Sequence, residues 1–125
     1  MFGDTELIGT FDKSFDSKGR IVIPSVMNPE EGDKLGIAYG ADYEHLLLMT
    51  LKSFRELYKR LETANNKEIL DQDPKLVEQM RRLIGIVEVD SQRRIQVPKY
   101  ALQRTGLKGN ITMVGQMTCL GVYKK

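Results

Sequence analysis

Residues 15–24 read FDSKGRIVIP, and residues 89–98 read VDSQRRIQVP. The two copies share an Asp-Ser pair, an Arg-Ile pair and a closing proline, which in the first copy are Asp16–Ser17, Arg20–Ile21 and Pro24. After each proline comes a short stretch, then a lysine, then two strand-like segments. We interpret this agreement as a tandem duplication that covers residues 5–50 and 84–124.

Each copy predicts the same order of elements: a strand, a tight turn, a second strand, a short helix and two further strands. β-branched residues favour strands at 21–23 and 86–89. Asp, Ser and Gly favour the turn, because the polar side chains bond nearby amides and Gly19 can adopt a positive φ. The second short helix is predicted over residues 99–105 and ends at Gly106, whereas Pro29 interrupts the first.

The segment between the copies is helical in pattern. Apolar residues recur at helical spacing, and Ser53 with Glu56 has the spacing of a capping box; the apolar positions are Leu51, Phe54, Leu57, Tyr58 and Leu61. A second helix is predicted to begin at Asp73 and Pro74 and to end at Gly85. Its apolar stripe is Leu76, Val77, Met80, Leu83 and Ile84.

These elements predict an α+β fold. A half-unit of this size is too small to bury a stable core alone, but two of them in one chain can complete one small β-barrel. We therefore expect a single domain over residues 1–125, with half-units at 5–50 and 84–124 and connecting helices over 51–83.

Composition sets limits on the partners. The hydrophobic fraction is 41%, and the net charge is only +2, so any basic footprint for nucleic acid must be local. The longest apolar run, Leu46–Met49, is far too short to cross a membrane, and the N-terminus has no signal-peptide pattern. The single cysteine, Cys119, excludes an intrachain disulfide framework, so we expect a cytoplasmic protein without a membrane partner.

The two turns, SKGR at 17–20 and SQRR at 91–94, are where a local basic surface is expected. If the halves pair about a pseudo-twofold axis, both turns emerge on one face of the molecule. That face would carry Lys13, Lys18, Arg20, Arg93 and Arg94, with Lys99 and Arg104 near it. Arginine beside a β-ribbon can bind guanine O6 and N7 in a DNA major groove, and lysine can hold phosphates.

A second interpretation of the same residues stays open. Asp16 with Arg20, and Asp90 with Arg94, can form local ion pairs that only close the turns. Lys18 and Arg93 are different, because a charge at a turn tip has no packing reason.

Signals for catalysis or metal binding are weak. His45 is the only histidine, which makes a zinc site unexpected, and Cys119 fits a structural thiol in a strand. Phosphate-binding and nucleophile-elbow motifs are absent from the sequence. We therefore expect no enzyme activity, no cofactor, no metal and no small-molecule substrate.

With both DSxxR turns in view, the chain resembles the MraZ family of bacterial transcriptional regulators, which are tandem relatives of the AbrB-like swapped-hairpin DNA-binding fold. The resemblance covers essentially the whole chain. It is carried by the opening MFG, FDSKGRIVIP, HLLLMTLKSF, RRLIGIVEVDSQRRIQVP and the closing ITMVG and LGVY.

This resemblance implies a barrel of two AbrB-like half-units, several of which assemble into a closed homo-oligomeric ring. The ring would bind repeated double-stranded DNA elements upstream of a cell-division and cell-wall gene cluster and regulate that cluster, as a repressor associated with the nucleoid. Carried over by position, the DNA-reading motifs are Asp16, Lys18, Gly19 and Arg20, then Asp90, Arg93 and Arg94. The arginines would contact DNA, and the aspartates would orient them.

The chain departs from the family pattern at three places. Arg93 replaces the usual glycine, which costs turn flexibility and adds a charge. Pro29 falls where the family usually continues a helix, so it should shorten or distort that helix. The given sequence reaches Lys125 soon after the last strand, where family members often carry a further helix. An alternative function is an AbrB-like antitoxin or protein-interaction module. The second half-unit and the ordered helical middle, which stand where such proteins have a disordered partner-binding tail, argue against it.

Overall fold

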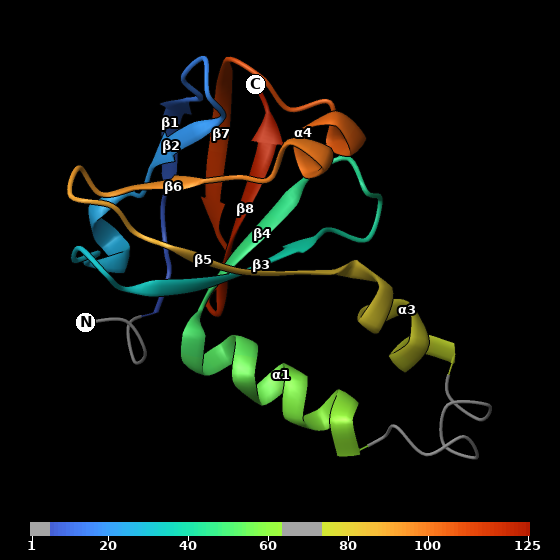
Figure 1. Ribbon diagram of the computed structural model, residues 1–125. Helices are drawn as coiled ribbons and strands as arrows, with labels where there is room; N and C mark the ends of the chain where they lie inside the picture. The colour runs from blue at the N-terminus through green and yellow to red at the C-terminus, as the bar shows by residue number, and fades with distance from the viewer. Residues whose placement is uncertain (1–5, 64–73) are drawn as a thin grey trace.

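The computed structural model describes residues 6–63 and 74–125, and their fold is α+β, as predicted. The first part forms β1 (Thr10–Ser14), β2 (Arg20–Val22), the 3-10 helix η1 (Ser25–Met27), β3 (Lys34–Tyr39) and β4 (Leu46–Thr50). Two helices follow, α1 (Leu51–Thr63) and α3 (Pro74–Arg82). The last part forms β5 (Leu83–Glu88), β6 (Arg94–Gln96), α4 (Lys99–Thr105), β7 (Asn110–Gly115) and β8 (Cys119–Lys124) (Figure 1).

The strands form two antiparallel sheets in which the two parts of the chain exchange partners. The larger sheet has the order β1-β7-β8-β4-β3-β5, and β2 pairs with β6 in a separate two-stranded ribbon. β1 therefore pairs with β7 from the last part, while β5 pairs with β3 from the first part. The ribbon is centred on the pair Ile21–Ile95, which occupies equivalent positions in the two sequence copies.

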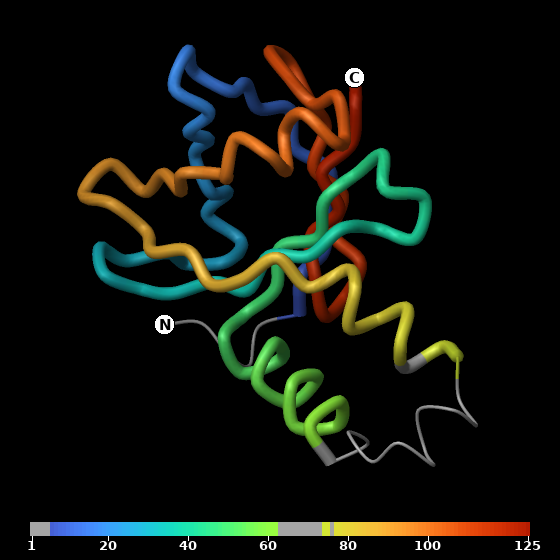
Figure 2. The backbone as a smooth tube through the Cα atoms, turned by 45° about the vertical axis from the view of Figure 1, so that its right-hand side comes forward, coloured from blue at the N-terminus to red at the C-terminus, as the bar shows by residue number. Residues whose placement is uncertain are grey.

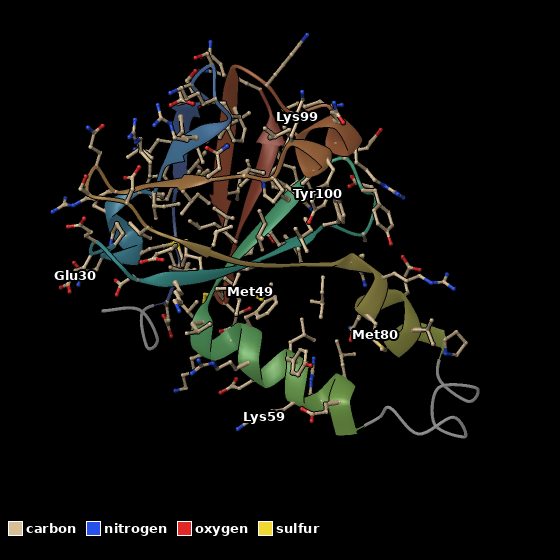
Figure 3. The ribbon with its side chains drawn as sticks, in the orientation of Figure 1. Glu30, Met49, Lys59, Met80, Lys99 and Tyr100 are labelled. Carbon is tan, nitrogen blue, oxygen red and sulfur yellow. The ribbon has the colours of Figure 1, made fainter. Side chains whose placement is uncertain are left out.

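The core lies between the ribbon and one face of the larger sheet. Ile21 and Ile95 of the ribbon are at most 2% exposed and belong to the same apolar cluster as Leu48 and Met113 of the larger sheet. A second, smaller cluster joins Phe54 of α1 to Ala38 and Met49. Figure 3 shows Met49 between the sheet and α1. The ribbon is thereby fixed to the sheet through its inward side chains, which leaves its other face outward.

Both short helices follow the sequence signals. α4 spans Lys99–Thr105, and the Gly106 amide donates to the Leu102 carbonyl at 2.9 Å with a φ of 74°, which is a left-handed C-cap. η1 is a single 3-10 turn that ends at Asn28, where φ is 48°, directly before Pro29. The expectation that Pro29 shortens this helix is confirmed.

The helix boundaries in the middle need two corrections. The prediction that Ser53 caps the first helix is wrong, because α1 begins at Leu51 and Thr50 Oγ1 accepts the Ser53 amide at 3.1 Å. The second helix ends at Arg82 rather than Gly85, because β5 begins at Leu83 and pairs with β3. The predicted cap at Asp73 lies outside the described residues.

The turns lie far from the connecting helices. In Figures 1 and 2, the β1–β2 turn lies at the top of the molecule and the β5–β6 turn at its left, at the two ends of the ribbon, and both lie away from α1 and α3. The fold thus separates a surface made by turns and ribbon from a surface made by helices.

Candidate nucleic-acid interface

The first turn is built around the carboxylate of Asp16. Its Oδ1 accepts the backbone amides of Lys18 and Arg20, both at 2.9 Å, and its Oδ2 accepts Nε of Arg20 at 2.7 Å. The Gly19 amide donates to the Asp16 carbonyl at 3.1 Å, with φ of 77° at Gly19. These bonds, of which the backbone bond from Arg20 has the largest effect, lower the pKa of Asp16. The charged carboxylate therefore holds the turn and one side of the arginine together.

The second turn repeats this arrangement. Asp90 Oδ1 accepts the amides of Gln92 and Arg94, both at 2.8 Å, and Oδ2 accepts Nε of Arg94 at 3.0 Å. The backbone bond from Arg94 has the largest effect in lowering the pKa of Asp90. Arg93 stands where the first turn has Gly19, and its φ of 60° is in the same left-handed region. The second turn thus keeps the shape that glycine would favour and accepts the strain of a side chain.

The local Asp–Arg pairs considered from the sequence are therefore present in both turns. They use the Nε side of each guanidinium, and a guanidinium has five N–H donors. The side chains of Arg20 and Arg94 are 30% and 22% exposed. An arginine fixed at Nε can still present its Nη donors to a ligand as a planar, oriented group.

The ribbon sets the spacing of the two turns. Its register pairs Arg20 with Gln96 and Val22 with Arg94, so the arginines stand at opposite ends of a three-residue antiparallel ladder. Arg94 Nη1 also lies 3.8 Å from Asp16 Oδ2, which links the two turns electrostatically. The structure brings Asp16, Arg20, Asp90 and Arg94 into one constellation.

The remaining predicted residues lie around this constellation or apart from it. Lys18 and Arg93 are exposed at the turn tips, and Lys13 is half-buried on β1. Lys99 is exposed at the start of α4, where Figure 3 labels it. Arg104 does not join the turns, because its guanidinium lies 4.3 Å from the ring centroid of Tyr43 in a cation–π contact.

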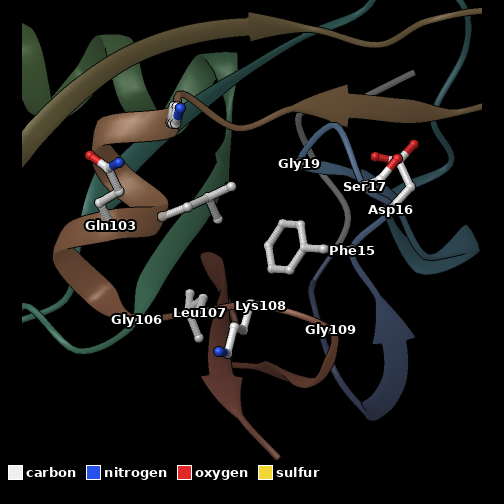
Figure 4. Close-up of a pocket in the computed structure, with 11 residues that line it drawn as sticks. Phe15, Asp16, Ser17, Gly19, Gln103, Gly106, Leu107, Lys108 and Gly109 are labelled. Carbon is white, nitrogen blue, oxygen red and sulfur yellow. The ribbon is translucent and has the colours of Figure 1, made fainter.

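A groove beside the first turn adds one cation, Lys108, that the sequence pattern did not indicate. It has a volume of about 420 Å³ between the turn and α4, and Figure 4 shows Phe15 pointing into it. Lys99 and Lys108 both line it. From its sequence position, Lys108 is only a lysine in a loop. Its loop reaches the first turn because β1 pairs with β7, and no local sequence pattern indicates that pairing.

The ribbon also presents two side chains that were not among the predicted site residues. Val22 is 41% exposed, and Gln96 is exposed beside it. Gln96 Nε2 donates to the Lys18 carbonyl, so the second strand of the ribbon supports the first turn. The alternation around buried Ile21 and Ile95 was the available signal.

The weak catalytic candidates have structural roles. His45 Nδ1 lies 2.7 Å from Asp42 Oδ1, and its ring stacks on Tyr123 with centroids 4.5 Å apart. Burial raises the pKa of the Cys119 thiol. Among residues 6–63 and 74–125, no three His, Cys, Asp or Glu side chains gather in a way that could hold a metal ion. Over the same residues, no helix has the length and apolar character needed to span a membrane.

Comparison with known proteins finds relatives that are named transcriptional regulators. No family model matches it. It is 26% identical to a protein named transcriptional regulator MraZ from Caldanaerobacter subterraneus subsp. tengcongensis, over 95% of this chain and 81% of that protein. The namesake from Acetivibrio thermocellus is 29% identical over 94% of this chain and 80% of its own length. That from Ureaplasma parvum serovar 3 is 27% identical over 86% and 74%.

The resemblance to the MraZ family, seen first in the two DSxxR turns, is therefore confirmed over nearly the whole chain. Among solved structures, the solution structure of PHS018 from Pyrococcus horikoshii aligns over 96% of this chain and 97% of that one. Its TM-score is 0.42 and its sequence identity 18%.

Proposed function

We propose that this chain is a sequence-specific DNA-binding transcriptional regulator. The observation that carries the proposal is the pair of arginine turns fixed at opposite ends of one outward-facing ribbon. The names of the relatives, transcriptional regulators throughout, support the same role.

In the proposed mechanism, the β2–β6 ribbon enters the major groove of double-stranded DNA. Arg20 and Arg94 donate from Nη to guanine O6 and N7, while Asp16 and Asp90 hold the Nε sides. Orientation before binding reduces the conformational entropy that each arginine loses on contact. The turns therefore hold both arginines in their DNA-binding orientation before DNA is bound.

Cationic side chains around Arg20 and Arg94 would bind the sugar–phosphate backbone. Lys18 and Arg93 stand at the turn tips, and Lys13 flanks them on β1. Gly19 contributes through its left-handed backbone, which allows the first turn to close. Phosphate contacts position the protein and make binding depend on salt, whereas the arginines supply sequence preference.

We extend the proposal to the architecture. Residues 5–50 and 84–124 would be duplicated AbrB-like half-units of one small barrel, with residues 51–83 connecting them. The exchange of β1 and β5 between the two parts supports this division, because each part needs the other to complete its sheet.

We also propose a homo-oligomeric ring that binds repeated promoter elements of a cell-division and cell-wall gene cluster, in the cytoplasm and on the nucleoid. Exposed apolar side chains on the helices support contacts between copies: Tyr58 of α1 is 55% exposed, and Met80 of α3 is 37% exposed. Because these helices lie away from the turns, copies could associate without covering the DNA-reading surface. Each further copy would add avidity on repeated DNA elements.

The test is duplex binding at several salt concentrations, with DNA from upstream of the gene that encodes this chain against a scrambled duplex. We expect preference for the upstream duplex and a log K that falls linearly with log salt. Arg20→Ala and Arg94→Ala should each weaken specific binding by about 10- to 100-fold, since a bidentate base contact contributes about 1–3 kcal/mol. Arg104→Ala is the matched control, because the Arg104 side chain contacts Tyr43 and does not join the turns. Equal affinity for both duplexes would refute the proposal.

A further inference from the structure

The outward face of the ribbon carries more than the two arginines. Because side chains alternate along a strand, burial of Ile21 and Ile95 turns their neighbours outward. The four outward side chains are Arg20, Val22, Arg94 and Gln96, and the register sets Val22 opposite Arg94 and Gln96 opposite Arg20. The arginines therefore have different neighbours, one apolar and one an amide.

The amide is already engaged within the protein. Gln96 Nε2 donates to the Lys18 carbonyl and, at 3.4 Å, to the Val97 carbonyl. Both N–H donors of its carboxamide are thus used, so a bidentate contact with adenine, which needs one of them, is unavailable without breaking the turn's support. Gln96 is a positioning residue of the first turn.

Val22 has no such role in the protein. It is an apolar side chain, 41% exposed, in a three-residue strand whose other outward residue is charged. Directly opposite residues of an antiparallel pair have Cβ atoms about 4.5–5.5 Å apart, so Val22 lies beside Arg94. Stacked bases are about 3.4 Å apart along a strand, so a group beside Arg94 faces the same base pair or an adjacent one.

The chemistry of the major groove then limits what Val22 can recognise. The C5-methyl group of thymine is the apolar feature that a base pair displays there, and small apolar side chains contact it. We propose that Val22 is a specificity-determining residue that contacts a thymine methyl group within one base pair of the guanine bound by Arg94. This inference rests on the proposed function, and it makes the two ends of the ribbon unequal in what they read.

The test changes one functional group of the DNA at a time. Each thymine of the preferred upstream duplex is replaced in turn by uracil, which lacks only the methyl group, and each guanine by 7-deazaguanine, which lacks the N7 acceptor. For the wild-type protein, we expect one uracil substitution to weaken binding about fourfold, as the loss of one buried methyl group implies. It should lie within one base pair of the guanine whose 7-deaza substitution affects the wild type but not Arg94→Ala.

Protein variants complete a double-mutant cycle. Val22→Ala and Val22→Ser should bind the thymine duplex about fourfold more weakly and show no further loss with uracil. Val22→Thr, which keeps one γ-methyl group and a β-branched side chain, should retain the sensitivity to uracil. Ile86→Ala removes an exposed apolar side chain from β5 and is the matched control, with full sensitivity expected. Circular dichroism confirms that each variant is folded.

The outcomes separate the two proposals. Uracil sensitivity that persists in Val22→Ala and Val22→Ser, or its absence in the wild type, would overturn the role of Val22. It would leave the regulator proposal in place if Arg94→Ala still loses the preference for the upstream duplex. A wild-type protein with no preference for that duplex would overturn both.

Discussion

The second turn of this protein holds an arginine in a backbone conformation that glycine adopts more easily. Arg93 has φ of 60°, and Gly19 at the equivalent place has φ of 77°. A left-handed conformation costs a residue with a Cβ about 1 kcal/mol, so a local contact or a ligand must favour the arginine. Its exposed side chain at the turn tip makes a DNA phosphate the ligand we infer.

Arg93→Gly separates these two effects. Relief of the backbone strain and the greater freedom of glycine in the unfolded chain nearly cancel, so the free energy of unfolding should change by less than about 0.5 kcal/mol. The slope of log K against log salt should become shallower by about 0.9, as expected for one lost phosphate contact. Urea denaturation and a salt titration of DNA binding measure the two quantities. An unchanged slope would remove Arg93 from the interface.

The first turn is predicted to reject a side chain. At Gly19, an added Cβ would lie 2.8 Å from Leu102 Cδ1 and 3.3 Å from Gln96 Nε2, at a φ of 77°. Gly109 has φ of 60° but open space around it, so it is the matched control. We expect Gly109→Ala to destabilise the protein by about 1 kcal/mol and Gly19→Ala by about 2 kcal/mol. If urea denaturation shows the same loss of unfolding free energy for both variants, the side chains of Leu102 and Gln96 move aside without destabilising the protein.

The carboxylates of the turns predict a dependence of stability on pH. The pKa values of Asp16 and Asp90 are lowered in the folded protein, first of all by backbone hydrogen bonds from Arg20 and Arg94. A lowered pKa stabilises the fold above the unfolded value of 3.8, and this contribution is lost as pH falls through the folded pKa. As pH falls below the unfolded value of 3.8, unfolding by urea should therefore become easier.

The double variant Asp16→Asn, Asp90→Asn should lose part of that dependence, and its stability should fall mainly at neutral pH. Asp42→Asn is the control outside the turns, because Asp42 also has a lowered pKa, chiefly through the Glu44 backbone amide. If Asp42→Asn alone flattens the pH profile and the double variant does not, the turns contribute little to acid sensitivity.

At the scale of elements, local signals predicted turns and short helices well. Gly106 ended α4 where its left-handed backbone allows, and Pro29 kept η1 to one turn. Tertiary pairing decided what local signals could not. Leu83 continues the helical spacing of α3, but its backbone pairs with Ala38 of β3, so the chain enters a strand there. In the same way, the groove at Lys108 depends on the exchange of strands rather than on any local pattern.

The N-cap of helix α1 is Thr50, three residues before Ser53, the cap predicted from the sequence. Thr50 is buried in β4 and its Oγ1 accepts the Ser53 amide, so one residue ends a strand and begins a helix. We expect Thr50→Val, which keeps the shape and removes the acceptor, to lower the free energy of unfolding by about 1 kcal/mol. Ser53→Ala should cost less, because it removes the bond from the Thr50 hydroxyl to Ser53 Oγ but leaves the backbone amide bonded to Thr50 Oγ1. A reversed order, measured by thermal or urea unfolding, would restore Ser53 as the cap.

At the scale of the whole molecule, each part of the chain supplies a strand that the other part lacks. β1 pairs with β7 and β5 with β3, while β2 and β6 meet in the ribbon that carries both turns. The apolar core combines side chains from both parts, for example Leu48 with Met113. The spacing of the two arginines is therefore a property of the complete fold and of neither part alone.

This exchange predicts that neither part folds as a monomer. A fragment of residues 6–63 lacks the partners of β1 and β2, and a fragment of residues 74–125 lacks those of β5 and β6. Each fragment is also too short to bury a sufficient core. Alone, each fragment should give the poorly dispersed amide NMR spectrum of an unfolded chain, or should form a dimer by pairing with a second copy of itself. Mixed in equal amounts, the two should give the dispersed spectrum of the intact chain. A single fragment that is folded and monomeric by sedimentation would show that the half-unit is stable without exchange.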